Sequence, residues 1–391
     1  MPAPIQVGPS LFDPLSREFI EDPYPTFRKL RAEDPVHWSE QLRSWVVSRY
    51  HDTRRVLVEY DTYCADSRPM GGDDHGASIS IQSLDPPDHT VVQRLLNSSF
   101  HAALTSDVRA LTQERAEKLL STAAERGETT DFVNHVAAPL SLEVTLRLLG
   151  VDIKSRHLLE CSAAIVRDMM SGLEPGATGP GQAAREQLAE TIEGLLESPG
   201  ADGMTRYLAE ADSIRELPRS YVVNSLRVFL LAGINSTQRF LANSLLALLS
   251  NLDAFRALGR CMAPTKALHE LARYDSPVQA QEKMVLADTE LGGRRLRRGD
   301  LVVVLLGSAN RDEAVFGRPD ALVLDRTPNP HLGFGVGHHT CLGAPLALLV
   351  AQAVLPYLSR RFPRTRLVGS PVRDSNPTLR GLLSLPVSLH G

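Results

Sequence analysis

The stretch HLGFGVGHHTCLGAPLA, from His331 to Ala347, places one cysteine among four glycines. The apolar spacing that follows predicts a helix over residues 342–362. A cysteine just before a helix lies where backbone N–H groups and the helix dipole stabilise a thiolate. Gly335, Gly337 and Gly343 let the backbone pass close to something flat or bulky. The pattern therefore favours Cys341 as a thiolate ligand for a soft metal.

The residues of this loop allow three other interpretations. Cys341 is a small residue of a type that is often simply buried. A zinc site through His338, His339 and Cys341 lacks a second ligand pair at the usual spacing. A phosphate-binding loop lacks the expected strand and lysine.

Composition restricts the class of protein. The 391 residues carry a net charge of −4, which does not indicate a nucleic-acid binder. The first residues show neither a basic segment nor a long apolar run, so we expect no signal peptide and no membrane anchor. Four widely spaced cysteines are typical of a reduced, cytoplasmic protein rather than of a disulfide framework.

Apolar periodicity predicts mostly helix with a small β portion. Helical patterns dominate 104–170, and a long helix over about 220–250 is apolar on most sides and therefore central. A helix starting near Asp22 ends before Pro35. Strands are expected near 44–50, within 284–293 and 300–307, and near the C-terminus, while 66–84 and 171–182 read as irregular stretches. We expect a single domain over 1–391.

The segment FGVGHHTCLG (334–343) resembles the haem-binding loop of the cytochrome P450 family, Phe-Gly-x-Gly-x-His-x-Cys-x-Gly. The resemblance implies the mainly α fold of that family and haem b with Cys341 as its axial thiolate, a ligand that favours O–O cleavage. It also implies that Phe334 covers the sulfur and that His339 and His331 reach the haem propionates. The matching residues are Phe334, Gly335, Gly337, His339, Cys341 and Gly343.

A second motif, HELAR (269–273), resembles the family's Glu-x-x-Arg helix. Glu270 and Arg273 are three residues apart and share one helix face. The resemblance supplies Arg326 as a third member of a structural cluster that locks the cysteine loop. The alternative is an ordinary surface ion pair, which stabilises little.

Two further stretches bear on the propionates. DPPDHTVVQRL (85–95) resembles the family's helix in which a histidine and an arginine four residues later bind a propionate. His89 matches, whereas Gln93 occupies the arginine position and Arg94 follows one residue late. Lys283 stands where the family has another propionate arginine, and lysine lacks the bidentate fork of arginine. The alternative is that these charges are solvated surface groups.

The long helix carries LLAGINSTQRF (230–240), which resembles the family's Ala-Gly-x-Asp/Glu-Thr pattern at the oxygen-binding face. Ala232 and Gly233 match and would open the oxygen groove. Asn235 replaces the acid and Ser236 the threonine, with Thr237 next, and these three are the catalytic candidates. Asparagine forms hydrogen bonds but cannot ionise to gate a proton. Either the replacements are tolerated, or the chemistry shifts from hydroxylation to oxidative coupling in an aromatic, peptide-like substrate.

The resemblance implies a monooxygenase that activates O2 with electrons from a ferredoxin and a ferredoxin reductase. Its substrate would be a small organic molecule of secondary metabolism; a non-catalytic haem carrier or gas sensor is the alternative. The family's residues after the cysteine are replaced by apolar ones, so Arg360, Arg361 or Arg94 would have to serve in partner docking. Substrate contacts are expected from 66–84, 171–182, Phe229, Ile234, Thr237, 278–281 and Leu382–Leu383.

Overall fold

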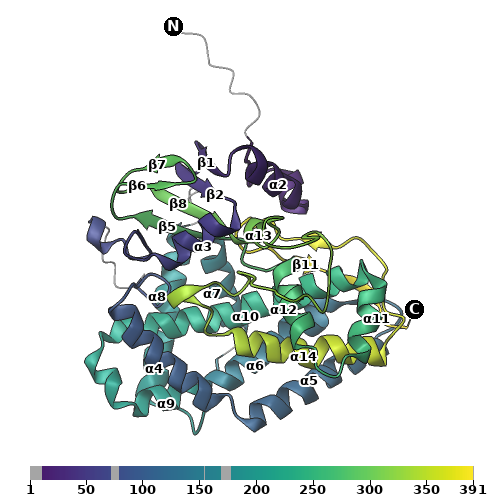
Figure 1. The fold of residues 1–391 in the computed structure, drawn as a ribbon. Coiled ribbons are helices and arrows are strands. Elements are labelled where there is room, and N and C mark those ends of the chain that lie inside the picture. Colours follow the sequence, from purple (N-terminus) through teal and green to yellow (C-terminus); the bar gives the residue numbers. More distant parts are fainter. Residues whose placement is uncertain (1–10, 72–78, 154, 169–177, 391) are drawn as a thin grey trace.

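The computed structural model describes residues 11–71, 79–153, 155–168 and 178–390. It confirms a mainly α fold with small sheets, in which the helices form the larger part and most strands lie to one side (Figure 1). The helices are α1 (Arg17–Glu21), α2 (Tyr24–Glu33), α3 (Tyr50–Val58), α4 (Asp88–Ala103), α5 (Ser106–Glu125), α6 (Ala138–Leu149), α7 (Ser155–Asp168), α8 (Thr178–Glu197), α9 (Met204–Glu210), α10 (Arg219–Leu249), α11 (Leu252–Arg260), α12 (Thr265–Tyr274), α13 (Leu306–Ala309) and α14 (Ala344–Arg361).

In the described part of the chain the strands are short and form four sheets. They are β1 (Val36–Ser39), β2 (Ser44–Val47), β3 (Tyr63–Cys64), β4 (Thr130–Asp131), β5 (Ala280–Val285), β6 (Thr289–Leu291), β7 (Arg294–Leu296), β8 (Leu301–Leu305), β9 (Arg366–Leu367), β10 (Val372–Arg373), β11 (Leu382–Ser384) and β12 (Pro386–Ser388). The largest sheet has the order β1-β2-β8-β5-β3, in which only the β2 and β8 neighbours run parallel.

Helix α10 lies at the centre of the helical part, as the sequence predicts. It packs against α6, α8 and α14, and Figure 1 shows it crossing the middle of the molecule above α14. Its side chains are buried almost all round, which explains its apolar composition. Within the described ranges, no helix is long and apolar enough to cross a membrane. The predicted end of α2 before Pro35 and the predicted helix after the cysteine loop are also confirmed.

The predicted strand over 300–307 is too long. β8 ends at Leu305, and the chain turns at once into α13. Gly307 lies so close to Gln279 that an added Cβ would be 1.9 Å from the side-chain oxygen of Gln279. The backbone therefore passes over Gln279 at a point where a continued strand with a side chain would clash.

The two irregular stretches fall partly outside the described residues, which exclude 72–78 and 169–177. Where it is described, the first contains a 3₁₀ turn over Arg68–Met70. Residues 178–182 of the second belong to α8, so the predicted irregular stretch is wrong for these five residues.

The C-terminal strands bring distant segments to α10. β10 and β11 pair antiparallel, and β12 lies between β4 and β9. β11 packs against α10, which places the hairpin of residues 372–384 beside the second half of that helix. We call this segment the C-terminal hairpin.

Candidate functional site

The cysteine loop is closed by its own backbone. The N–H of Cys341 donates to the carbonyl of Phe334 at 2.8 Å, and the hydroxyl of Thr340 donates to the carbonyl of Gly337 at 2.7 Å. Gly335 and Gly337 have φ angles of 70° and 77°, in the left-handed region that favours glycine. The glycines thus set the path that ends with Cys341 just before α14.

Cys341 differs from the other cysteines in its exposure. Cys64 and Cys161 are buried and Cys261 is half-buried, whereas Cys341 as a residue is exposed. Protein atoms around its sulfur nevertheless desolvate the thiol and raise its pKa, while the N–H groups of Gly343 and Ala344 at the start of α14 lower the pKa. A coordinated metal deprotonates a thiol outright, so this sulfur is arranged to become a thiolate when a metal binds it.

One face of α10 is turned toward this loop. Phe240 contacts Phe334, with 6.2 Å between the ring centroids. Ser236 and Ala232 precede Phe240 by one and two turns and therefore share its face. Ala232 is exposed, although α10 is otherwise buried almost everywhere. The hydroxyl of Ser236 donates to the carbonyl of Ala232 at 2.8 Å. This exposed face and the exposed cysteine belong to neighbouring elements.

The three candidate catalytic residues do not share that face. Asn235 is only 9% exposed, and its amide nitrogen donates to the carbonyl of Leu231 and to the hydroxyl of Ser162 in α7, both at 2.8 Å. Thr237 is buried as well. Of the three, only Ser236 lies on the side of Ala232. Ser162 was not identified from the sequence, since a serine within a helix carries no signal of such a contact.

Imidazole rings gather beside the cysteine loop. His89 in α4 lies 4.5 Å from His339 and 5.1 Å from His338 between ring centroids, and His338 Nε2 is 3.2 Å from a carboxylate oxygen of Asp85. Burial, followed by the neighbouring imidazoles, lowers the pKa of His89 to about 3. Its buried Nδ1 has no hydrogen-bond partner within the described residues. Lys283 in β5 is also buried. Burial lowers the pKa of its ammonium group, and the negative charge of Asp85 partly offsets this shift.

The structure separates Gln93 from Arg94. The side-chain nitrogen of Gln93 donates to the carbonyl of His338 at 2.7 Å. Arg94 is exposed on the outer side of α4. The propionate contact inferred for Arg94 stays a prediction, and in this structure the neighbour that faces the loop is Gln93.

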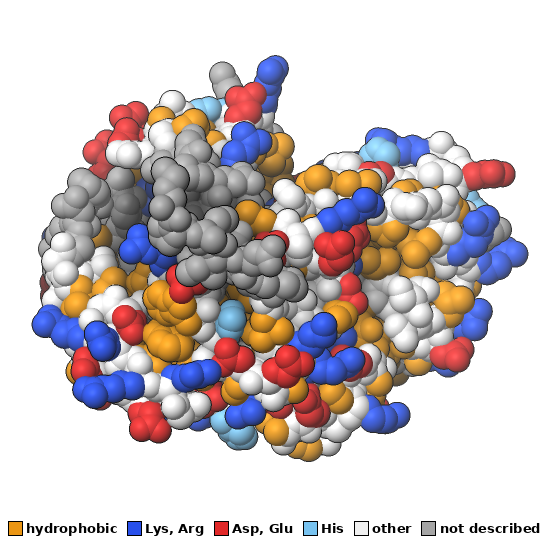
Figure 2. All heavy atoms as spheres, turned by 90° about the horizontal axis from the view of Figure 1, so that it is seen from above, with side chains coloured by type: hydrophobic (Ala, Val, Ile, Leu, Met, Phe, Trp, Pro, Cys, Tyr) orange, Lys and Arg blue, Asp and Glu red, His pale blue; other side chains and the backbone are white. Residues whose placement is uncertain are grey.

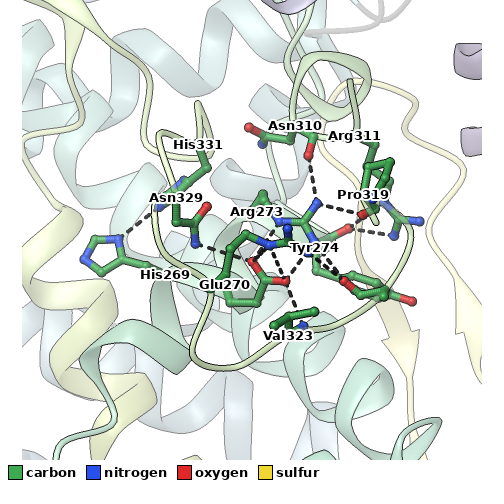
Figure 3. A network of polar contacts seen from close by, with 12 residues as sticks. His269, Glu270, Arg273, Tyr274, Asn310, Arg311, Pro319, Val323, Asn329 and His331 are labelled. Atoms are coloured by element: carbon green, nitrogen blue, oxygen red, sulfur yellow. Dashed lines mark hydrogen bonds and ion pairs between the residues drawn. The ribbon is translucent and has the colours of Figure 1, made fainter. Parts of the chain in front are cut away.

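His331 is engaged by protein groups at both ring nitrogens. Its Nδ1 accepts from the N–H of Gly333 at 3.1 Å, and its Nε2 lies 2.9 Å from His269 Nδ1 (Figure 3). Because Nδ1 is an acceptor, the ring proton of a neutral His331 is on Nε2, which donates to His269. A propionate contact of His331 stays a prediction, and it would require one of these partners to be exchanged.

Glu270, Arg273 and Arg326 lie together. Both carboxylate oxygens of Glu270 accept from Arg273, at 2.7 and 2.8 Å, and Arg326 Nε donates to the same carboxylate at 2.9 Å. Arg273 also donates to the carbonyl of Asn310 at 2.8 Å (Figure 3). The side chain of Asn310 in turn accepts from the N–H of Leu332, in the cysteine loop, at 2.6 Å. The side chains of Glu270 and Arg273 are completely buried. The cluster thus extends through Asn310 to the loop.

The residues present fit a haem. Cys341 is exposed in a loop whose Phe334 contacts Phe240 of α10, the helix on which Ala232 is exposed. The orphaned Nδ1 of His89 suits the carboxylate of a propionate. Asp85, His338 and His339 are the one group of three described residues whose ligand atoms come within 4.8 Å of one another. That group excludes Cys341, so among the described residues a zinc site of His338, His339 and Cys341 is not assembled.

Comparison with known proteins agrees with this geometry. Residues 264–389 match the family model of cytochrome P450. Nocardicin C N-oxygenase of Nocardia uniformis is 32% identical over 384 residues, which cover 94% of this chain and 95% of that protein. The chain belongs to the cytochrome P450 family. As a cytochrome P450, it is an oxidoreductase of a haem-thiolate monooxygenase family.

Solved cytochrome P450 structures share the fold. The polyketide biosynthesis cytochrome P450 PksS of Bacillus subtilis is 29% identical, and its structure superposes with a TM-score of 0.88 over 97% of this chain and 100% of that chain. The structure of CYP109E1 from Bacillus megaterium in complex with testosterone gives a TM-score of 0.87 at 28% identity, over 96% of this chain and 100% of that chain.

Proposed function

We propose that this cytochrome P450 binds haem b through Cys341 in one domain over 1–391. It uses O2 to oxidise a small organic substrate of secondary metabolism, with electrons from a ferredoxin and its reductase. The observation that carries the proposal is the exposed Cys341 in a loop that contacts α10 through Phe334 and Phe240, together with the exposed Ala232 on that helix. The similarity to PksS and to nocardicin C N-oxygenase supports the secondary-metabolite role. Four free cysteines support action in the cytoplasm.

Each element contributes one task. The iron of the bound haem supplies the activation of O2, as a thiolate ligand favours O–O cleavage. Phe334 packs at the loop and shields the sulfur, with Gly335 and Gly343 admitting the haem face. Ala232 would leave room for O2. Gly233 instead lies against α6, because an added Cβ there would be 2.8 Å from the Cγ2 atom of Thr145. Ser236, whose hydroxyl is anchored to the Ala232 carbonyl, holds a water and passes a proton.

The imidazole group and Lys283 hold the propionates in this proposal. His89 and His339 are close enough to act together, with 4.5 Å between their ring centroids. Lys283 is the buried cation beside them. Gln93 stands in place of the family's arginine and carries no charge. Binding of the propionates therefore depends on the single positive charge of Lys283 and not on a pair of guanidinium groups.

The structure reduces the number of residues that are expected to contact the substrate. Ile234 and Thr237 are buried within the protein, so contact with a substrate falls to Phe229, which is half-buried and packs edge-on against Phe100 at 5.6 Å between centroids. Leu383 in the C-terminal hairpin is 55% exposed, whereas Leu382 is buried. Aromatic and aliphatic groups of this kind suit an apolar substrate.

The partner surface is proposed at the exposed end of α14. Arg360 and Arg361 are exposed there, and Arg94 is exposed on α4. Figure 2 shows a different face, seen from above, on which lysine and arginine side chains are interspersed with aspartate and glutamate. The two neighbouring arginines at the end of α14 would suit a contact with an acidic ferredoxin.

A second function, oxidative coupling in an aromatic peptide-like substrate without oxygen insertion, is favoured by Asn235. Its amide is directed to Leu231 and Ser162 and cannot ionise. Coupling needs abstraction of hydrogen and not transfer of a hydroxyl group, so it depends less on an ionisable acid at this position.

The test begins with the purified ferric protein. Its Soret band is followed during titration with aromatic cyclic peptides and, separately, with polyketide and terpenoid scaffolds. Compounds that shift the iron toward high spin are then turned over with ferredoxin, reductase and ¹⁸O2. Hydroxylation places one labelled atom in the product, whereas coupling leaves both labelled atoms in water.

Two variants separate the site from the fold. Cys341→Ser should retain the fold and lose the thiolate spectrum and all turnover, while Cys261→Ser should match the parent protein. A parent protein that binds haem but consumes no reducing equivalents with any compound would point instead to a non-catalytic haem protein.

A further inference from the structure

Asn235 is held by a network that reaches the C-terminal hairpin. Arg239, one turn further along α10, donates from Nη1 to the side-chain oxygen of Asn235 at 3.3 Å and to its backbone carbonyl at 3.4 Å. The other terminal nitrogen of Arg239 bonds to the carboxylate of Asp374 in the hairpin. Arg239 is buried, and 18% of the Asp374 side chain is exposed. One guanidinium group thus bridges the oxygen-side helix and the hairpin.

These partners allow one orientation of the Asn235 amide. Arginine only donates and the Leu231 carbonyl only accepts, so the amide oxygen must face Arg239 and the nitrogen must face Leu231. The same nitrogen reaches Ser162 in α7. The amide of Asn235 is therefore the point at which α7, α10 and the hairpin meet.

The orientation of this amide acts on the backbone at the oxygen groove. Asn235 donates to the carbonyl of Leu231, and Ser236 donates to the next carbonyl, that of Ala232. Side chains that bond carbonyls four residues back compete with the helical N–H groups and bend a helix. Two such bonds in succession lie where Ala232 borders the proposed oxygen site.

The hairpin is shaped to admit Arg239. An added Cβ at Gly381 would lie 2.3 Å from Arg239 Cγ and 2.7 Å from its Cδ. The N–H of Asp374 donates to the carbonyl of Gly381 at 3.1 Å, so the residue that pairs with Arg239 and the residue that makes room for it are joined. A side chain at position 381 would push the guanidinium group out of its place.

We propose that Arg239, supported by Asp374, is a positioning residue for the oxygen side of this cytochrome P450: it keeps the Asn235 amide on Leu231 and Ser162 and so keeps the groove at Ala232 competent for productive proton delivery. The inference rests on the proposed function.

The test compares four variants with the parent protein. Arg239→Gln removes the bridge between Asn235 and Asp374. Arg239→Lys keeps a positive charge next to Asp374, but its single ammonium group cannot bind Asp374 and Asn235 at the same time. Gly381→Ala displaces Arg239 without changing any charge. The matched control is Arg373→Gln, because Arg373 ties the same hairpin to α10 through Asn243 at 3.4 Å and does not contact Asn235.

The measurements are haem content, the substrate-induced spin shift, and the share of consumed electron pairs released as hydrogen peroxide. We expect haem content and spin shift to persist in both Arg239 variants while peroxide per electron pair rises roughly tenfold, the change that loss of one hydrogen bond to a buried polar group produces. Gly381→Ala should follow them, and Arg373→Gln should resemble the parent protein even where its melting temperature falls.

Unchanged peroxide release in Arg239→Gln and Arg239→Lys, or an equal rise in Arg373→Gln, overturns the inference. A crystal structure of the Arg239→Gln protein gives a readout that does not depend on turnover. It should show the Asn235 amide turned away from Leu231, and an unmoved amide there also overturns the inference. Absence of haem or of electron consumption in the parent protein would defeat the proposed function instead.

Discussion

The side-chain amide of Gln93 in α4 donates a hydrogen bond to the backbone carbonyl of His338, with 2.7 Å between the two atoms. This bond fastens the helix that carries His89 to the loop that carries Cys341. A glutamine at the place of a propionate arginine therefore keeps a role in the site, although it supplies no charge.

Replacing Gln93 by Ala should weaken haem retention. The loop loses a half-buried hydrogen-bond donor, which costs about 1 kcal/mol and corresponds to roughly fivefold faster haem loss. Transfer of haem to an acceptor apoprotein measures the rate. Arg94→Ala is the control: Arg94 is exposed, and we expect no change. Faster loss in Arg94→Ala alone would assign the propionate contact to Arg94.

Replacing Glu270 by Gln should destabilise the protein strongly. Its carboxylate is completely buried between Arg273 and Arg326, so two guanidinium groups lose their counter-ion, at a cost of about 3 to 5 kcal/mol. Urea unfolding followed by circular dichroism measures the loss. Glu59→Gln, which breaks the exposed pair of Arg55 and Glu59, should cost less than about 1 kcal/mol. Similar losses for the two variants would contradict a structural role of the buried cluster.

Ser236 and Thr237 should respond differently to loss of their hydroxyl groups. Ser236 lies on the face of Ala232 and bonds to its carbonyl, whereas Thr237 is buried elsewhere. Ser236→Ala should lower product formation by on the order of a hundredfold, the size of a general acid–base contribution, and divert electrons to peroxide. Thr237→Val should keep the product yield. The opposite result would assign the proton-carrying hydroxyl to Thr237.

The stability of the protein should depend on pH through His331. Burial, with the nearby charges of His269 and Arg273, lowers the pKa of His331 from 6.5 to about 3. Below pH 6.5 the imidazole of His331 binds a proton in the unfolded chain but stays neutral in the folded protein. The free energy of unfolding therefore decreases as the pH drops below 6.5. One such group contributes about 1.4 kcal/mol for each pH unit.

Chemical unfolding of the parent protein and of His331→Asn between pH 7 and 5 measures this slope, which should be smaller in the variant by roughly 1 kcal/mol per unit. Equal slopes would show that His331 is not held neutral. That result is expected if His331 is instead an imidazolium paired with a haem propionate.

Much of the fold was predictable because it rests on local patterns. The end of α2 follows from Pro35, and the long buried helix α10 follows from apolar residues on nearly all sides. The strand after Asp300 was predicted too long, because its end depends on the close approach of Gly307 to Gln279, a residue 28 positions earlier in the chain.

The sequence by itself determined the identity of the ligand loop. The order of glycine, histidine and cysteine residues around Cys341 is a local pattern, and the conformation that it requires is encoded within ten residues. Spacing along a helix also determined that Glu270 and Arg273 share a face.

Only the tertiary structure decided which side chains serve that loop. Asn235 and Ser236 are neighbours in the chain, yet one bonds to α7 and the other lines the groove. Arg239 contacts Asp374, which is 135 residues later in the chain, and no sequence periodicity predicts this contact. The physical reason is that a helix directs successive side chains about 100° apart. What each one meets then depends on segments that only folding brings alongside.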